Sequence, residues 1–76
     1  MAIAVSKLKK NNLKTYYLVV STYDDKGHTT ANIVEEREAI AQPENKYFEK
    51  RDKDVYFEWY DNYAEARQAV EDARNA

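Results

Sequence analysis

Apolar and polar side chains alternate in several segments of the chain with the period of two that is typical of β-strands. The first segment, KTYYLVVSTY at residues 14–23, is rich in β-branched and aromatic residues, which favour extended structure. DDKG follows it, and Gly27 can adopt the left-handed conformation that closes a short hairpin loop. HTTANIVEE at residues 28–36 is therefore expected to be the returning strand of an antiparallel hairpin.

The stretch at residues 29–42 supports two interpretations. Thr29 or Thr30 could cap a helix through NIVEEREAIAQ, because EEREAIAQ consists of good helix formers and Pro43 would stop the helix. The β-branched residues at the start of this stretch favour a strand instead. We expect a strand to about Glu35, followed by one or two helical turns before the break at QPEN.

The last third of the chain changes from a strand pattern to a helix pattern. KYFEK and VYFEWY flank the polar sequence RDKD and predict a second hairpin. Asn62 and Glu65 then stand in the N-cap and N3 relation of a capping box. An apolar stripe follows at helical spacing, formed by Tyr63, Ala66, Val70 and Ala73. An amphipathic helix is predicted over about residues 62–74.

Together these elements predict the α+β class, with a small antiparallel sheet of three or four strands packed on a C-terminal amphipathic helix. A chain of 76 residues is expected to be one domain, residues 1–76, that buries only about 60% of its unfolded surface. Residues 1–13 are predicted to form either a short strand, joined to the next one through Asn11 and Asn12, or a frayed terminus.

Both faces of the predicted sheet carry apolar side chains, and a single helix can cover only one of them. We assign eight residues to the helix-covered core: Leu18, Val20, Ile33, Val55, Phe57, Trp59, Ala66 and Val70. Val34 and several tyrosines then lie on the other face, and tyrosine is common on binding surfaces because it combines a large contact area with a hydroxyl group. Alternatively, the N-terminal stretch or residues 36–45 fold over that face and complete an ordinary core. The candidate protein-contact residues are Tyr17, Val19, Tyr23, Tyr56 and Tyr60.

Composition argues against several kinds of chemistry. The chain has no cysteine, one glycine and one histidine, His28, which rules out disulfides, thiolate metal ligands and a glycine-rich phosphate loop. Neither serine lies in a nucleophile-elbow sequence, and His28 lies beside the predicted turn, where a solvated imidazole is the ordinary case. We therefore expect a protein that is not an enzyme, with no catalytic residue, metal, cofactor or small-molecule ligand.

The charge distribution suggests a second type of partner. The net charge is −2, but residues 1–30 carry a net charge of +3 and residues 31–76 a net charge of −5. The lysines near the start of the chain, together with adjacent tyrosines, offer cations and stacking platforms for nucleic acid. A nucleic-acid-binding domain is therefore the alternative hypothesis, and its candidate residues are Lys7, Lys9, Lys10 and Lys14.

YDDKG, together with an aromatic strand that leads into NYAEA, is similar in outline to the arm-type DNA-binding domain of tyrosine integrases. The resemblance covers about half of the chain by pattern and implies a small sheet, a C-terminal helix and DNA as partner. Members of that family carry clustered basic residues on the second strand, where this chain has HTTANIVEE. We do not assign the chain to the family.

The leading hypothesis is a small non-enzymatic protein-interaction module, an accessory, regulatory or inhibitor protein of the kind that phages and mobile elements encode. Its expected partner is an unknown protein or a second copy in a homodimer. No apolar run approaches the about 20 residues that span a bilayer. Charges follow the apolar start MAIAV rather than precede it, unlike in a signal peptide. We therefore expect a cytoplasmic protein that binds no membrane.

Overall fold

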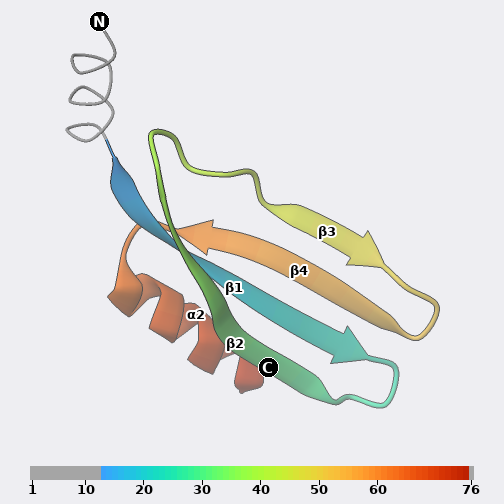
Figure 1. The fold of residues 1–76 in the computed structure, drawn as a ribbon. Coiled ribbons are helices and arrows are strands. Elements are labelled where there is room, and N and C mark those ends of the chain that lie inside the picture. Colours follow the sequence, from blue (N-terminus) through green and yellow to red (C-terminus); the bar gives the residue numbers. More distant parts are fainter. Residues whose placement is uncertain (1–12, 76) are drawn as a thin grey trace, which may run out of the picture.

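The computed structural model describes residues 13–75, which form a four-stranded antiparallel sheet and one helix (Figure 1). The elements are β1 (Lys14–Asp24), β2 (Thr29–Ala39), β3 (Lys46–Glu49), β4 (Lys53–Tyr60) and α2 (Tyr63–Arg74). The strand order is β2-β1-β4-β3, so the two hairpins lie side by side and β1 pairs with β4 at the centre. The predicted α+β class, with an antiparallel sheet and a C-terminal helix, is confirmed.

The first hairpin extends further than the sequence predicted. β2 continues to Ala39, and its last residues pair with the start of β1, from Leu18 opposite Glu35 to Lys14 opposite Ala39. The prediction of helical turns after Glu35 is therefore wrong. Pairing of this segment with β1, the most apolar strand, outweighs the helix propensity of EEREAIAQ. The register shifts between Leu18 and Val19, which leaves Val34 as the extra residue of a β-bulge.

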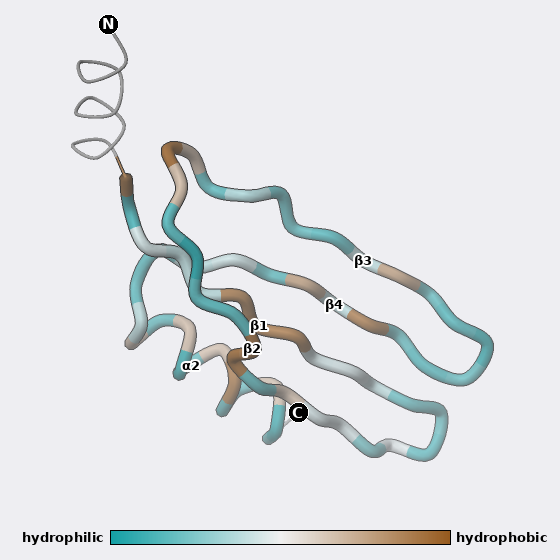
Figure 2. The backbone as a smooth tube through the Cα atoms, in the orientation of Figure 1, coloured by the Kyte–Doolittle hydropathy of each residue, from teal (hydrophilic) through white to brown (hydrophobic). Residues whose placement is uncertain are grey.

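The second hairpin confirms its prediction. β3 and β4 pair from Lys46 opposite Phe57 to Glu49 opposite Asp54, and the Lys50 amide donates to the Lys53 carbonyl at 2.8 Å to close the turn. Figure 2 shows that the tips of both hairpins are hydrophilic, whereas hydrophobic segments lie within the strands and at the bend between β2 and β3. The apolar core therefore lies in the body of the sheet.

Helix α2 begins where the capping pattern predicts. The side-chain oxygen of its N-cap, Asn62, accepts a hydrogen bond from the Glu65 amide at 3.1 Å, which satisfies one of the free donors of the first turn. The last turn is held against β2, because Arg74 Nε donates to the Ala31 carbonyl at 3.0 Å and Arg74 Nη2 donates to Asn32 Oδ1 at 2.8 Å. Both ends of the helix are thus fixed by specific hydrogen bonds.

The helix covers the sheet face opposite to the one that the sequence analysis assigned to it. Ala66, Val70 and Ala73 pack with Val19 and Ala31 into one buried cluster. Tyr16, Leu18 and Trp59 form a separate cluster, with Val20 and Phe57 packed against it. The core assignment is correct for Ile33, Ala66 and Val70. It is wrong for the residues whose strand positions place them on the other face, which are Leu18, Val20, Val55, Phe57 and Trp59.

The size of the side chains explains which face α2 covers. Its buried residues include Ala66 and Ala73, and the strand residues at the centre of their cluster are Val19 and Ala31. Small side chains on both sides let the helix approach the sheet closely and fill the space between them. The rings on the other face, Trp59 above all, would hold a helix further away.

Two sequence predictions concern residues that the structure does not describe. The first is the short strand or frayed terminus expected in residues 1–13, of which only Leu13 is described. The second is the set of candidate DNA contacts Lys7, Lys9 and Lys10, which lie outside residues 13–75. Over the described part of the chain, no helix has both the length and the apolar character needed to cross a bilayer.

Candidate interaction surfaces

Three of the five predicted protein-contact residues lie between the sheet and α2. Val19 is only 1% exposed. Tyr17 and Tyr60 are half-buried and pack against the cluster under α2, and the Tyr17 ring meets the Tyr63 ring edge-on at 5.4 Å between centroids. The expectation that this part of the face is open is therefore wrong, because α2 lies on it.

The other two predicted residues, Tyr23 and Tyr56, remain accessible beyond the helix. Their rings meet edge-on at 5.6 Å between centroids, and the Tyr47 ring on β3 continues the row at 4.8 Å from that of Tyr56. We call Tyr23, Tyr56 and Tyr47 the aromatic strip. Sequence reasoning missed Tyr47, although counting back along the second hairpin from its loop places Tyr47 opposite Tyr56.

Acidic side chains border the aromatic strip. Partial burial raises the pKa of Tyr60, and the nearby Glu58 and Asp72 carboxylates raise that pKa further. Partial desolvation also raises the pKa of Tyr47, whose hydroxyl donates to Asp54 Oδ1 at 3.2 Å. Both tyrosines are thus held in the neutral form beside negative charge.

The face of the sheet that points away from α2, which we call the open face, contains a groove of about 570 Å³. Leu18, Phe57 and Trp59 line it from the two central strands. Side chains of both charges form its walls, with Glu35 and Arg37 from β2 on one side and Glu44 and Lys46 from the loop and β3 on the other. Pro43 and Phe48 add apolar surface to the second wall. The groove therefore combines an apolar floor with charged walls.

One end of the open face is built around Trp59, which is 7% exposed. The Arg37 guanidinium lies 4.9 Å from the centre of its ring and is paired with Glu35 at 2.7 Å. Residues 40–45 pack against the same strand, since Gln42 Nε2 donates to the Trp59 carbonyl and the Trp59 amide donates to Asn45 Oδ1. The loop thus lies beside the Trp59 end of β4, at the wall of the groove, and not over the tyrosines as the sequence alternative proposed.

The other end of the open face is less covered. Phe48 and Phe57 meet edge-on at 5.5 Å between ring centroids, and Phe48 remains 47% exposed on the short edge strand β3. Val20 and Phe57 are half-buried. A patch of two rings and an aliphatic side chain is therefore accessible at the surface.

The hairpin turn accounts for the position of His28. Asp24 accepts hydrogen bonds from the Lys26 amide at 2.9 Å and the His28 amide at 2.7 Å, and its other carboxylate oxygen lies 3.2 Å from His28 Nδ1. Gly27 has φ +83°, the left-handed conformation that the turn requires. Asp24 thus organises the turn and holds the imidazole at its rim, where 77% of the His28 side chain is exposed.

We expect replacement of Asp24 by asparagine to lower thermal stability at neutral pH and to have little effect in strong acid. The hydrogen bond from the His28 amide is the main cause that lowers the pKa of Asp24. The Asp24 carboxylate therefore binds a proton less readily in the folded state than in the unfolded state. The stabilisation is present above the unfolded-state pKa of about 3.9 and is lost as the pH falls through the lowered value. Melting curves of both proteins at several pH values measure the difference.

The matched control for Asp24 is Asp25→Asn, which removes the same charge from the same turn. The Asp25 carboxylate accepts none of the turn hydrogen bonds described above. Its melting temperature at neutral pH should therefore stay close to the wild-type value. A constant difference between wild type and Asp24→Asn across the acid range would refute the proposed role of the Asp24 charge.

Two further observations bear on the sequence predictions about metal ions and nucleic acid. Within residues 13–75, histidine, aspartate and glutamate side chains form no group of three that could hold a metal ion. Lys14, an exposed residue at the start of β1, is the one candidate nucleic-acid contact that the structure places. Comparison of the chain with protein-family models, with curated proteins and with solved structures finds no match. The function must therefore be argued from the two surfaces themselves.

Proposed function

We propose that the protein is a non-enzymatic protein-interaction module that works as a homodimer joined through the open face. In this arrangement the amphipathic helix α2 closes one side of the sheet, and a second copy closes the other side. The observation that carries the proposal is the groove floored by Leu18, Phe57 and Trp59, with the half-exposed Phe48 at its margin. No other helix or strand of residues 13–75 covers this face (Figure 1).

The charges around the groove favour a second copy as the occupant. The β2 wall carries Glu35 and Arg37, and the opposite wall carries Glu44 and Lys46. In a two-fold dimer the same patch meets itself, so the β2 wall of one copy can face the β3 wall of the other. Each wall then offers an acid and a base to its counterpart, which supports a defined register.

The size of the open face is sufficient for a specific interface. The strands β1, β2, β3 and β4 contain 11, 11, 4 and 8 residues. With strands about 4.8 Å apart and a rise of about 3.3 Å per residue, the whole open face of one copy has an area of about 500 Å². Two copies would bury about 1,000 Å² in total, which is the lower limit for a specific interface.

Analytical ultracentrifugation tests the proposal directly. From micromolar to millimolar concentration, the mass should rise from 8.9 kDa towards twice that value. Because the contact is mainly apolar, the dimer should persist in molar sodium chloride, and the fluorescence of the single tryptophan should change with assembly. A mass of 8.9 kDa at every concentration would overturn the homodimer.

Dimerisation defines how this module would act, as an accessory, regulatory or inhibitor protein that presents two copies of the helix-covered face. In a face-to-face dimer, α2 of each copy lies on the outside. A further partner would therefore meet the surfaces beside α2, including the aromatic strip.

A further inference from the structure

The helix-covered side of the sheet has a second recess, between α2 and the aromatic strip. Two adjoining hollows of about 260 Å³ and about 290 Å³ share Ser21, Tyr23 and Glu58 in their lining. Ala69 and Ala73 of α2 line the hollow of about 260 Å³, and their short side chains leave the space between the helix and the strands unfilled. The recess continues from the helix to the Tyr56 ring.

Negative charge dominates this recess. Glu58 projects from β4 and Asp72 from α2 into its lining, and no lysine or arginine lines either hollow. In the described part of the chain, the ion pairs within 4 Å are His28 with Asp24 and Arg37 with Glu35, and neither involves these two acids. The polar contacts of Glu58 and Asp72 are with neutral donors, the Tyr60 hydroxyl at 3.4 Å and Gln68 Nε2 at 2.9 Å.

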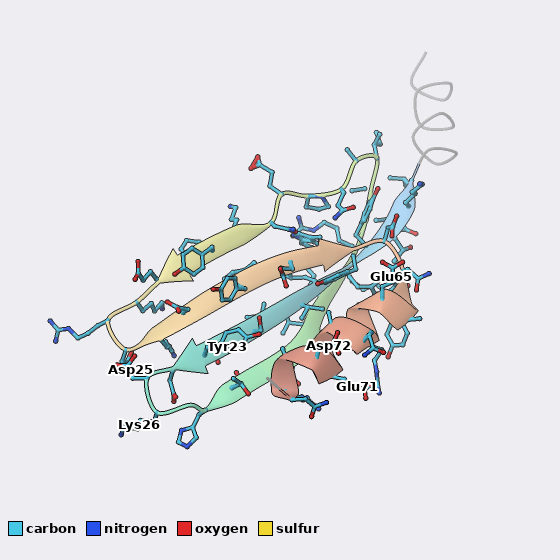
Figure 3. All side chains as sticks on the ribbon, turned by 180° about the vertical axis from the view of Figure 1, so that it is seen from behind. Tyr23, Asp25, Lys26, Glu65, Glu71 and Asp72 are labelled. Carbon is cyan, nitrogen blue, oxygen red and sulfur yellow. The ribbon has the colours of Figure 1, made fainter. Side chains whose placement is uncertain are left out.

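The two sides of α2 differ in whether basic side chains lie beside their acidic residues. Figure 3 shows Asp72 on the side of the helix near the strand that carries Tyr23, with Glu71 on the other side. Glu71 lines a different hollow, which also contains Arg67 and Arg74. Glu71 therefore has basic neighbours on the protein itself, whereas Asp72 and Glu58 face a recess that has none.

We propose that this recess, which we call the acidic groove and define by Tyr23, Tyr56, Glu58, Tyr60 and Asp72, binds an arginine side chain of a partner protein. A guanidinium group is planar, stacks on an aromatic ring and donates paired hydrogen bonds to a carboxylate. The groove provides both elements, tyrosine rings on its sheet side and carboxylates from β4 and α2. Lysine would gain the charge interaction but not the paired hydrogen bonds.

The same acids act on the protein's own tyrosines, which supports their effect on a ligand. Glu58 and Asp72 both contribute to the raised pKa of Tyr60, after partial burial. A field that opposes a phenolate anion favours a cation at the same place. The acidic groove lies on the side of the sheet away from the open face, so it does not depend on the homodimer.

Isothermal titration with an acetylated tetra-arginine amide at an ionic strength of about 0.15 M, where the Debye length is about 8 Å, tests the proposal. The wild-type protein should bind the peptide, and Glu58→Gln and Asp72→Asn should each weaken binding about tenfold, the usual cost of losing one charged hydrogen-bond partner. Both substitutions keep a side-chain acceptor for the Tyr60 or Gln68 contact. Circular dichroism of each variant verifies that the fold is retained.

The matched control is Glu71→Gln, which lowers the negative charge by the same amount one residue away on the same helix. Its affinity for tetra-arginine should stay within about twofold of the wild-type value, because Glu71 lies beside Arg67 and Arg74 on the other side of α2, and surface substitutions away from a contact have small effects. Equal losses for Glu71→Gln and Asp72→Asn would overturn the groove in favour of diffuse attraction. Absence of wild-type binding, or equal affinity for tetra-lysine, would overturn it as an arginine site. The mass measurement stays unaffected by any of these outcomes, so failure here is separable from failure of the homodimer.

Discussion

Replacing Val19 by aspartate is expected to unfold the protein, whereas replacing its neighbour Val20 by aspartate should leave it folded. Val19 is 1% exposed beneath α2, so a carboxylate there would be buried without a partner. That penalty of several kcal/mol is comparable to the total stability of a small domain, about 5 kcal/mol. Val20 points to the open face and is half-buried, so an aspartate there can reach solvent.

Far-UV circular dichroism and urea titration of the two variants measure the contrast. Val19→Asp should lose the helix signal and the cooperative transition, while Val20→Asp should keep both at a lower midpoint. Two adjacent valines make a matched pair, since the chemical change and the strand are the same. The opposite result, an unfolded Val20→Asp and a folded Val19→Asp, would show that α2 covers the face of Val20, as the sequence analysis predicted.

Local signals in the sequence were sufficient to predict the first turn and the start of α2, but not the end of β2 at Ala39. Gly27 after two aspartates fixes the first turn, and the structure gives it the positive φ that such a turn needs. Asn62 and Glu65 define the start of α2 through a hydrogen bond between neighbours in the chain. Each of these features depends on residues a few positions apart, and their geometry follows from the sequence alone.

The choice of face could not be predicted, because the alternation of β1 and β4 is apolar on both sides. An alternation with a period of two predicts which residues share a face of the sheet, but it does not predict which face a helix will cover. The sequence analysis assigned the face with the larger apolar side chains, such as Trp59 and Phe57, to the helix-covered core. The helix instead packs on Val19 and Ala31, where small residues permit close contact.

The two candidate surfaces depend on contacts between distant parts of the chain. Arg37 reaches Trp59 because β2 continues past Glu35, in a segment whose composition predicted a helix. The acidic groove joins Asp72 of α2 to Glu58 of β4, which requires both the register of the strands and the position of the helix. Neither surface has a sequence motif, and for that reason their tests use substitutions at single positions.

Replacing Phe48 by serine is expected to weaken the homodimer about thirtyfold, the effect of removing one central aromatic contact of an interface. Phe48 packs edge-on against Phe57 on the open face and is 47% exposed in the single copy. Its ring would become buried only when a second copy covers the groove. Sedimentation equilibrium over a concentration series measures the change in the dimer dissociation constant.

Tyr47→Ser is the matched control for Phe48→Ser, because the two residues are neighbours on β3 with similar exposure, 51% and 47%. Their rings lie on opposite faces of the sheet, Tyr47 against Tyr56 and Phe48 against Phe57. Removal of the Tyr47 ring should leave the dimer dissociation constant within about twofold of the wild-type value, since surface substitutions away from a contact have small effects. A larger loss of dimer for Tyr47→Ser than for Phe48→Ser would place the interface on the helix-covered side and refute assembly through the open face.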